Sequence, residues 1–384
     1  MPLPSMSIRA KLAVSAAALT ALAVLAVIAL TTTLMSRAAM RQAEDQARAM
    51  MGEYAATLTR EMSGVTELVR TGVAAVEGVM VQAQPDRDLL GEVVTGILET
   101  RPDLVGMTLA LEPDAWGPDS AAIGHAYSDA AGRFVPYFYH MPDGTVAVEQ
   151  LDMSPEAGTD SWYARPMRDD RSLITPPYLY AVNGQDVLMA TVSGVVRPQG
   201  RPVGILTADL SLAQLSARID QLRPFGEGRV RLISSGGLWI AHQDAALLGQ
   251  AVSDADRALL DGAPMHYATV GGAEMMVLHA PVDFVGVEEQ WTLVMQVPRA
   301  TVMAPVALMR ERAVLAAVLL LLGTLAVVWF GARVVSRPVE ALTAAMRRLA
   351  KGDLDTPIPH ADRRDELGAM AGAMQVFRGH AQEA

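Results

Sequence analysis

Two apolar stretches decide how this chain folds: LAVSAAALTALAVLAVIALTTTLM at residues 12–35 and AVLAAVLLLLGTLAVVWFGA at residues 313–332. Each reaches the roughly 20 residues that an α-helix needs to cross the hydrocarbon core of a bilayer. Neither contains a charged side chain. A helix satisfies its own backbone hydrogen bonds, which lipid cannot do. We therefore predict two transmembrane helices, at 12–35 and 313–335, that enclose a folded module at 36–312.

Basic residues beside the two stretches predict the orientation. Arg9 and Lys11 precede the first stretch, and a basic cluster follows the second. This cluster consists of Arg333, Arg337, Arg347, Arg348 and Lys351. By the positive-inside rule, residues 1–11 and the C-terminal segment are cytoplasmic and residues 36–312 are exported. A cleaved signal peptide is the alternative for the first stretch, although 24 residues is long for its apolar part. We expect a two-pass membrane protein.

Charge and composition narrow the possible partners. The formal net charge is −11, and no lysine lies between the two apolar stretches. An acidic surface disfavours nucleic acid and anionic lipid as partners and favours cationic solutes. The chain has no cysteine, which excludes disulfides, thiol nucleophiles and thiolate metal sites. It also lacks G-x-S-x-G, P-loop and H-x-x-x-H signatures, so we expect no enzyme activity, cofactor or metal.

A long helix is predicted at 36–83, because the segment lacks proline and repeats apolar residues at three- and four-residue steps. These apolar positions are Ala47, Met51, Tyr54, Leu58, Met62, Val65 and Val69. A mostly polar helix with one apolar stripe usually needs a partner helix, so we expect this stripe to be the seam of a homodimer. Pro85 ends the helix, and Asp86 or Asp88 caps a second helix that runs to Glu99.

Short strands separated by Gly, Pro, Asn and Asp follow, which is typical of an α+β fold. The segment Pro224 to Gly228 is predicted to be a linker between a larger module at 84–223 and a smaller one at 224–299. The strands expected in the first module are 105–111, 133–140, 145–149, 185–196 and 202–210, with a helix at 212–222. Those expected in the second are 230–234, 238–242, 265–270, 273–279 and 290–297, with a helix at 254–260. Residues 300–312 return as a helix to the membrane.

The segment 336–384 resembles a HAMP domain. It carries P-V-E at 338–340, G-D-L at 352–354 and D-E-L-G at 365–368, in the order and spacing of that family. The resemblance implies two short amphipathic helices joined by an extended connector. Helices of this length cannot bury their apolar stripes alone, so we expect a helical hairpin that forms a dimeric bundle.

The module at 36–312 resembles a double Cache domain, the sensor with two PAS-like modules found in bacterial chemoreceptors and sensor kinases. S-W-Y at 161–163, T-P-P-Y at 175–178 and A-D-L at 208–210 carry the resemblance in the larger module. Segments 236–249 and 291–298 carry it in the smaller one. The resemblance implies a transmembrane chemoreceptor of the methyl-accepting chemotaxis type in the bacterial inner membrane. Its sensor at 36–312 would lie in the periplasm and bind its ligand in the membrane-distal module.

Residue by residue, the amino-acid-sensing branch of that family implies a site made by Trp162, Tyr163, Tyr178 and Asp209. Two positions depart from that branch. Asp160 stands where the branch has an arginine that grips the ligand carboxylate, and Pro155 stands where it has a tyrosine. An aspartate cannot bind a carboxylate as a guanidinium does, so this change reverses the preferred ligand charge.

A pocket with carboxylates at both ends and aromatic rings between them suits a cation, because ring faces attract ammonium groups. We therefore expect an amine ligand, namely a quaternary amine, a polyamine or a biogenic amine, as in amine-sensing relatives of the branch. Glu156 is a weaker candidate for a third anion, for a longer diamine. The expectation depends on Asp160 lying in the pocket with Trp162 and Asp209.

Plainer interpretations remain open for these residues. Asp209 can cap the helix that starts near Leu212, and Asp160 can cap a helix at 161–168. Trp162 and Tyr163 can be ordinary core residues. An arginine at a shifted position can still clamp a carboxylate, which keeps amino acids as the alternative ligand. The candidates for that clamp are Arg165, Arg168 and Arg171.

Together these features predict a homodimeric receptor that relays occupancy of the distal module through HAMP to a cytoplasmic signalling module or to chemotaxis proteins. No methyl-accepting coiled coil, kinase core or cyclase core follows in this sequence. We therefore expect the output domain in a longer chain or in a partner. The sensor of a histidine kinase or a diguanylate cyclase is the competing class. A scaffold without a ligand is a further alternative.

Overall fold

The computed structural model describes residues 8–82 and 84–383. It contains two compact units, one spanning Arg41–Val302 and the other formed by the described parts of Met1–Met40 and Met303–Ala384. Most of the predicted cytoplasmic N-terminus at 1–11 lies outside the described residues. So do position 83 of the predicted long helix and position 384 of the predicted HAMP domain.

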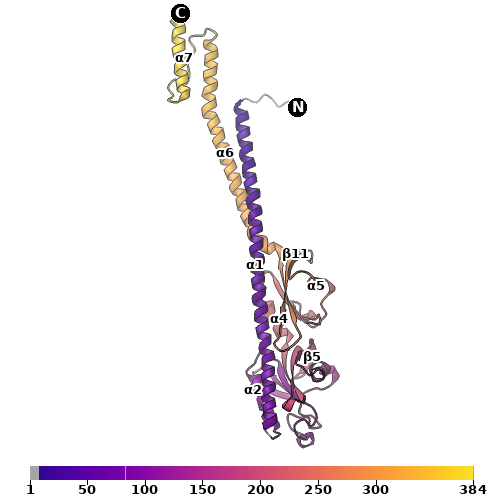
Figure 1. Ribbon diagram of the computed structural model, residues 1–384. Helices are drawn as coiled ribbons and strands as arrows, with labels where there is room; N and C mark the ends of the chain where they lie inside the picture. Colours follow the sequence, from indigo (N-terminus) through magenta and orange to yellow (C-terminus); the bar gives the residue numbers. More distant parts are fainter. Residues whose placement is uncertain (1–7, 83, 384) are drawn as a thin grey trace. The chain divides into compact units, whose positions relative to one another are not determined.

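Helix α1 runs without interruption over Ile8–Gln82, so the predicted first span and the predicted long helix are one element. Its apolar stripe beyond Arg41 packs inside the same chain. Met62, Val65 and Val69 are at most 2% exposed in the single chain, and the Val69 side chain lies against Gly194 of the sheet. The stripe that we expected to be a dimer seam is therefore mainly an intramolecular core contact, because the sensor sheets supply the apolar partner. In Figure 1 this part of α1 runs alongside the strands.

The larger module is an antiparallel sheet beside α1 and α2 (Arg87–Glu99). Its strands are β1 (Gly106–Leu111), β2 (Pro136–His140), β3 (Val146–Gln150), β4 (Leu173–Ile174), β5 (Tyr178–Val182), β6 (Gln185–Val196) and β7 (Gly204–Ser211). Their order is β3-β2-β1-β7-β6-β4, with β5 also paired to β6. The predicted strands are confirmed, except that β2 begins three residues later than expected. Strands β4 and β5 were not predicted from the sequence, because Pro176 and Pro177 lie between them and interrupt the strand pattern.

The smaller module is a second antiparallel sheet, in the order β10-β11-β12-β8-β9. Its strands are β8 (Arg229–Ile233), β9 (Trp239–Ala241), β10 (Met265–Val270), β11 (Ala273–Val282) and β12 (Trp291–Pro298). Helix α4 (Leu212–Asp220) leads into this module, and the short helix α5 (Asp254–Ala258) lies within it. Trp239, Val252 and Val277 form part of its core. The expected pair of α+β modules on one long helix is confirmed.

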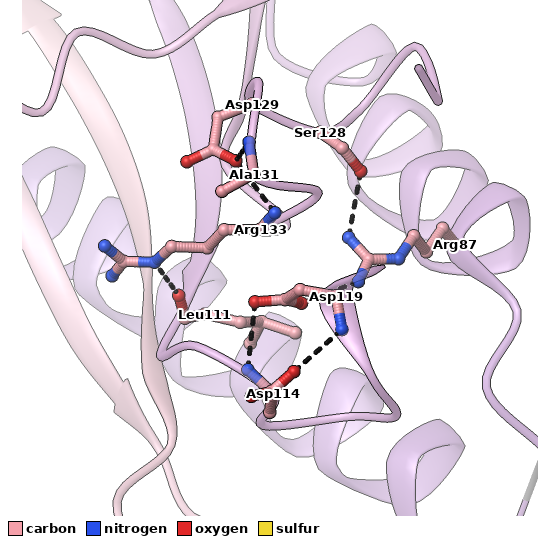
Figure 2. A network of polar contacts seen from close by, with 8 residues as sticks. All are labelled: Arg87, Leu111, Asp114, Asp119, Ser128, Asp129, Ala131 and Arg133. Atoms are coloured by element: carbon pink, nitrogen blue, oxygen red, sulfur yellow. Dashed lines mark hydrogen bonds and ion pairs between the residues drawn. The ribbon is translucent and has the colours of Figure 1, made fainter. Parts of the chain in front are cut away.

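A long loop between β1 and β2 is fastened to α2 by a buried ion pair, which Figure 2 shows. The Arg87 guanidinium lies 2.8 Å from the Asp119 carboxylate and donates to the Ser128 hydroxyl at 2.9 Å. Both charged side chains are nearly buried, at 11% and 13% exposure. Farther along the loop, Asp129 accepts hydrogen bonds from two backbone amides and Arg133 donates to the Leu111 carbonyl. These contacts hold Arg133 beside the end of β1.

The other unit contains the start of α1, most of α6 (Arg299–Leu349) and α7 (Glu366–Glu383). Helices α1 and α6 each contain a stretch long and apolar enough to cross a membrane, and none of these stretches is buried within the chain. The end of α6 packs on α7 through Leu342, Ala345 and Met374, which confirms the helical hairpin.

The D-E-L-G sequence at the start of α7 has a structural role. Asp365 accepts a hydrogen bond from the Gly368 amide at 3.1 Å, as a helix-capping residue does. A Cβ atom on Gly368 would lie only 1.9 Å from the Arg363 carbonyl oxygen. Any larger residue would therefore displace the connector from the helix.

Candidate functional site

The segment that carries Trp162 folds as a π-helix, η3 (Asp160–Ala164). Such turns are rare and often occur at functional sites. The Trp162 indole N–H donates to the Ala157 carbonyl at 2.9 Å, and the Trp162 carbonyl accepts from the Ser193 hydroxyl at 2.8 Å. Gly158, with φ of +76°, precedes η3, and a Cβ there would lie 2.9 Å from the Tyr178 ring. The segment is thereby fixed against β5 and β6.

A small polar cavity lies between η3 and the sheet. Its volume is about 10 Å³, room for a group of about the size of one water molecule. The lining residues come from the sheet, the loop after β3 and η3: Thr108, Tyr137, Leu151, Trp162, Tyr178, Tyr180, Met189, Thr191, Thr207 and Asp209. Three of the predicted site residues, Trp162, Tyr178 and Asp209, thus surround one cavity.

Asp209 is the charged residue of this cavity. Its side chain on β7 is 3% exposed, and its carboxylate accepts a hydrogen bond from the Thr191 hydroxyl at 2.6 Å. No Lys, Arg or His in the described part of the chain forms an ion pair with it. Burial raises the pKa of the Asp209 carboxyl to about 6, although the Thr191 and Tyr137 hydroxyls favour its ionised form. Ser211, not Asp209, caps α4, because its hydroxyl accepts from the Gln214 amide. The capping interpretation of Asp209 is therefore wrong.

Tyr137 is a cavity residue that sequence reasoning missed. It lies on β2 opposite Thr108 of β1 and is 2% exposed. Its hydroxyl has no well-aligned hydrogen-bond partner among the described residues, although it is close enough to Asp209 to influence that carboxyl. The sequence shows three consecutive aromatic residues in β2, Tyr137 to Tyr139, and this run does not tell which face of the strand meets the cavity.

The other predicted site residues lie outside the cavity. Asp160 is exposed at the start of η3, and Glu156 is exposed in the preceding turn. Residues two apart on a helix do not share a face, so a buried Trp162 turns Asp160 outward. The Tyr163 hydroxyl donates to Glu112 and accepts from Arg133, away from the cavity. The expected pair of facing carboxylates is therefore not formed, and Asp209 alone supplies the negative charge.

The arginines considered as a carboxylate clamp also lie elsewhere. Arg165 and Arg171 each approach Glu289, at 3.4 and 3.6 Å, and Glu289 lies in the loop between β11 and β12. Arg168 pairs with its neighbour Asp169. None of these arginines lines the cavity. Instead, Arg165 and Arg171 join the segment after η3 to the smaller module.

Comparison with protein families identifies the two kinds of domain. Residues 90–217 match the model of the methyl-accepting chemotaxis protein-like first PDC sensor domain, and residues 330–383 match that of the HAMP domain. These two segments therefore carry a sensor domain like that of methyl-accepting chemotaxis proteins and a HAMP domain. The PDC domain is close to the Cache domain that the sequence resembles, so this resemblance is confirmed.

Individual relatives agree with this assignment. The methyl-accepting chemotaxis protein TlpQ of Pseudomonas aeruginosa is 27% identical over 328 residues, which cover 76% of this chain and 45% of TlpQ. A probable chemoreceptor of Sinorhizobium fredii, y4sI, is 29% identical over 217 residues, which cover 54% of this chain and 27% of the relative. The chain thus spans less than half the length of these curated relatives.

Solved structures show the same fold. The chain resembles the methyl-accepting chemotaxis protein X with a TM-score of 0.54 and 25% identity, over 67% of this chain and 97% of that one. It also resembles the periplasmic sensory domain of the Campylobacter jejuni chemoreceptor Tlp1, with a TM-score of 0.53 and 14% identity, over 67% and 95% of the two chains. The latter similarity concerns the fold alone.

Proposed function

We propose that this chain is the sensory region of a chemotaxis receptor that binds a small protonated amine in its membrane-distal module. The observation that carries the proposal is the buried Asp209 carboxylate, which lies among aromatic rings and has no cationic partner within residues 8–82 and 84–383. An isolated buried charge is costly, and a ligand ammonium would compensate it. The rings of Trp162, Tyr137 and Tyr178 add attraction for a cation.

An amine is favoured over an amino acid by what the cavity contains. An amino acid brings a carboxylate that needs a cation or several donors. No cationic side chain of the described residues lines the cavity, and Arg165 and Arg171 are engaged by Glu289. The charge-reversal argument from the sequence is wrong, because it required Asp160 in the pocket and Asp160 is exposed. The preference for an amine therefore depends on Asp209 alone, and amino-acid sensing is the alternative.

Binding is proposed to signal by changing the packing around the cavity. The cavity admits only a small group, so the rest of a ligand must displace the η3 segment or the loop after β3. A ligand that binds the displaced arrangement more tightly shifts the population toward it. The change would reach α6 through the modules and be relayed by HAMP to chemotaxis proteins. A histidine kinase or diguanylate cyclase output is the alternative.

The first prediction tests ligand class. The full chain in detergent is expected to gain thermal stability with n-butylamine or 1,4-diaminobutane and none with succinate, because only the amines compensate Asp209. An amine at one hundred times its Kd should add about 2.7 kcal/mol. The measurement is the unfolding midpoint followed by tryptophan fluorescence. Midpoints that rise with L-amino acids and not with the amines would favour the alternative.

Membrane orientation is the second proposal, with α1 and α6 crossing the inner membrane, both termini in the cytoplasm and a homodimer as the assembly. Because the chain lacks cysteine, a single introduced cysteine can report on which side of the membrane its position lies. In intact spheroplasts, a membrane-impermeant maleimide is expected to label Ala130→Cys and to leave Gln382→Cys unlabelled until lysis. Both positions are exposed, so their side chains are accessible. The opposite labelling pattern would reverse the proposed topology.

A further inference from the structure

Resting on the proposed amine site, we infer that the ligand enters the cavity with a primary ammonium group, and that the Tyr137 hydroxyl selects it over N-methylated ammonium groups. The cavity geometry distinguishes these headgroups by hydrogen-bond donors and by size. A primary ammonium carries three N–H donors, whereas a trimethylammonium carries none.

The hydrogen bonds around Asp209 determine which atoms remain available. The Thr191 hydroxyl has one hydrogen, and it is donated to the Asp209 carboxylate at 2.6 Å. The Tyr178 hydroxyl lies 2.6 Å from the Thr191 oxygen, so Tyr178 must be the donor in that contact. The Tyr178 oxygen therefore keeps its lone pairs for an incoming N–H group.

Tyr137 supplies a further acceptor. Its ring is held by neighbours on the same face, with ring centroids 6.1 Å from Tyr139 and 5.3 Å from Tyr180. The hydroxyl end lies over Gly106, where a Cβ atom would be only 2.7 Å away. This buried hydroxyl has no well-aligned partner in the described part of the chain. A buried polar group without a partner is unusual, and a ligand N–H would provide one.

Three oxygen acceptors thus surround one small space: the Asp209 carboxylate, the Tyr137 hydroxyl and the Tyr178 hydroxyl. Three acceptors match the three N–H donors of a primary ammonium. When the ammonium donates to Tyr137, the hydroxyl hydrogen is free to turn toward Asp209, so the charge pair and the hydroxyl support each other.

The cavity volume leads to the same choice. About 10 Å³ admits a group of about the size of water, which is also about the size of a primary ammonium. Each N-methyl group removes a donor and needs space that Trp162 and Met189, both at most 2% exposed, already occupy. A site built for hydrogen bonds discriminates strongly against analogues that lack them.

The test is a headgroup series on one carbon chain: n-butylamine and its N-methyl, N,N-dimethyl and N,N,N-trimethyl forms. Binding to the full chain in detergent is measured by calorimetry at pH 7.5, with sodium chloride at equal ionic strength as the blank. We expect Kd to rise along the series, at least tenfold from the primary to the trimethyl form. A trimethyl form that binds as tightly as n-butylamine overturns the inference.

Tyr137→Phe removes the hydroxyl and little else. We expect it to weaken n-butylamine about tenfold and the trimethyl form less than twofold, so the preference shrinks. Since the hydroxyl has no well-aligned hydrogen-bond partner among the described residues, the unfolding midpoint without ligand should change little. A Phe variant that retains the wild-type preference overturns the role of Tyr137.

Failure of the inference and failure of the proposed function give different results. If the wild-type chain binds the whole series equally and Asp209→Asn abolishes this binding, the amine site stands and headgroup selection is wrong. If no amine of the series or of the first screen binds to the wild-type chain, the proposed function is wrong and the inference with it.

Discussion

Replacing Asp209 by asparagine is expected to abolish the thermal response to amines and to stabilise the unliganded chain at pH 7.5. The carboxyl has a pKa of about 6 in the folded protein against a usual 3.8. A raised pKa means that this group stabilises the fold below pH 3.8 and that the contribution disappears as the pH rises through about 6. The loss is on the order of 3 kcal/mol. Asparagine carries no charge, so the variant does not undergo this loss of stability.

The pH profile separates this cause from a general effect of mutation. The stability difference between Asp209→Asn and wild type should shrink as the pH falls from 7 to 4, when the wild-type carboxyl is protonated. Amine binding to the wild type should strengthen as the pH rises through about 6 and then level off, because the ammonium needs the ionised carboxylate. Urea unfolding and calorimetry across this range measure both quantities.

Asp186→Asn is the matched control, since Asp186 is an exposed aspartate on the neighbouring strand β6. Its substitution should change stability by less than about 0.5 kcal/mol and leave the amine response intact. If Asp209→Asn retains the response to amines, or follows the wild-type pH dependence, Asp209 is not the ammonium-binding group.

Replacing Glu289 by glutamine is expected to destabilise the unit 41–302 by about 1 to 3 kcal/mol. The Glu289 side chain is 11% exposed and is the least exposed acidic partner of Arg165 and Arg171, whose other partners are Asp169 and Glu288. Removing a buried charge partner leaves the remaining charges less well compensated. We expect less than the full cost for a buried pair, because the two arginines are each about one-third exposed and remain partly solvated.

Glu288→Gln provides the comparison for this prediction. Glu288 also approaches Arg171, at 3.3 Å, but its side chain is 82% exposed. Its replacement should cost less than about 0.5 kcal/mol, as for other surface ion pairs. Urea unfolding of the full chain in detergent measures both variants, and equal losses would show that burial of Glu289 does not matter. The contact joins the segment after Trp162 to the loop that precedes β12, so its loss should also weaken the connection between the modules.

Local features of the sequence predicted most of the fold. Apolar length marked the parts of α1 and α6 that can cross a membrane, and fixed motif spacing marked the hairpin around Asp365 and Gly368. Except for β4 and β5, the strands of both sheets followed from alternating apolar residues and turn residues. These signals are local, because helix length, capping and strand alternation depend on neighbours in the chain.

Trp162, Tyr178 and Asp209 line one cavity, and the family resemblance, which includes their spacing, predicted that they lie together. An aspartate among aromatic rings could thus be expected from the residue pattern. Tertiary structure alone decided that Asp160 faces solvent and that Tyr137 reaches Asp209. It likewise decided that the stripe on α1 meets the sheets of its own chain. The physical reason is that side-chain direction depends on helix phase, strand register and packing partners, which bring together residues far apart in sequence.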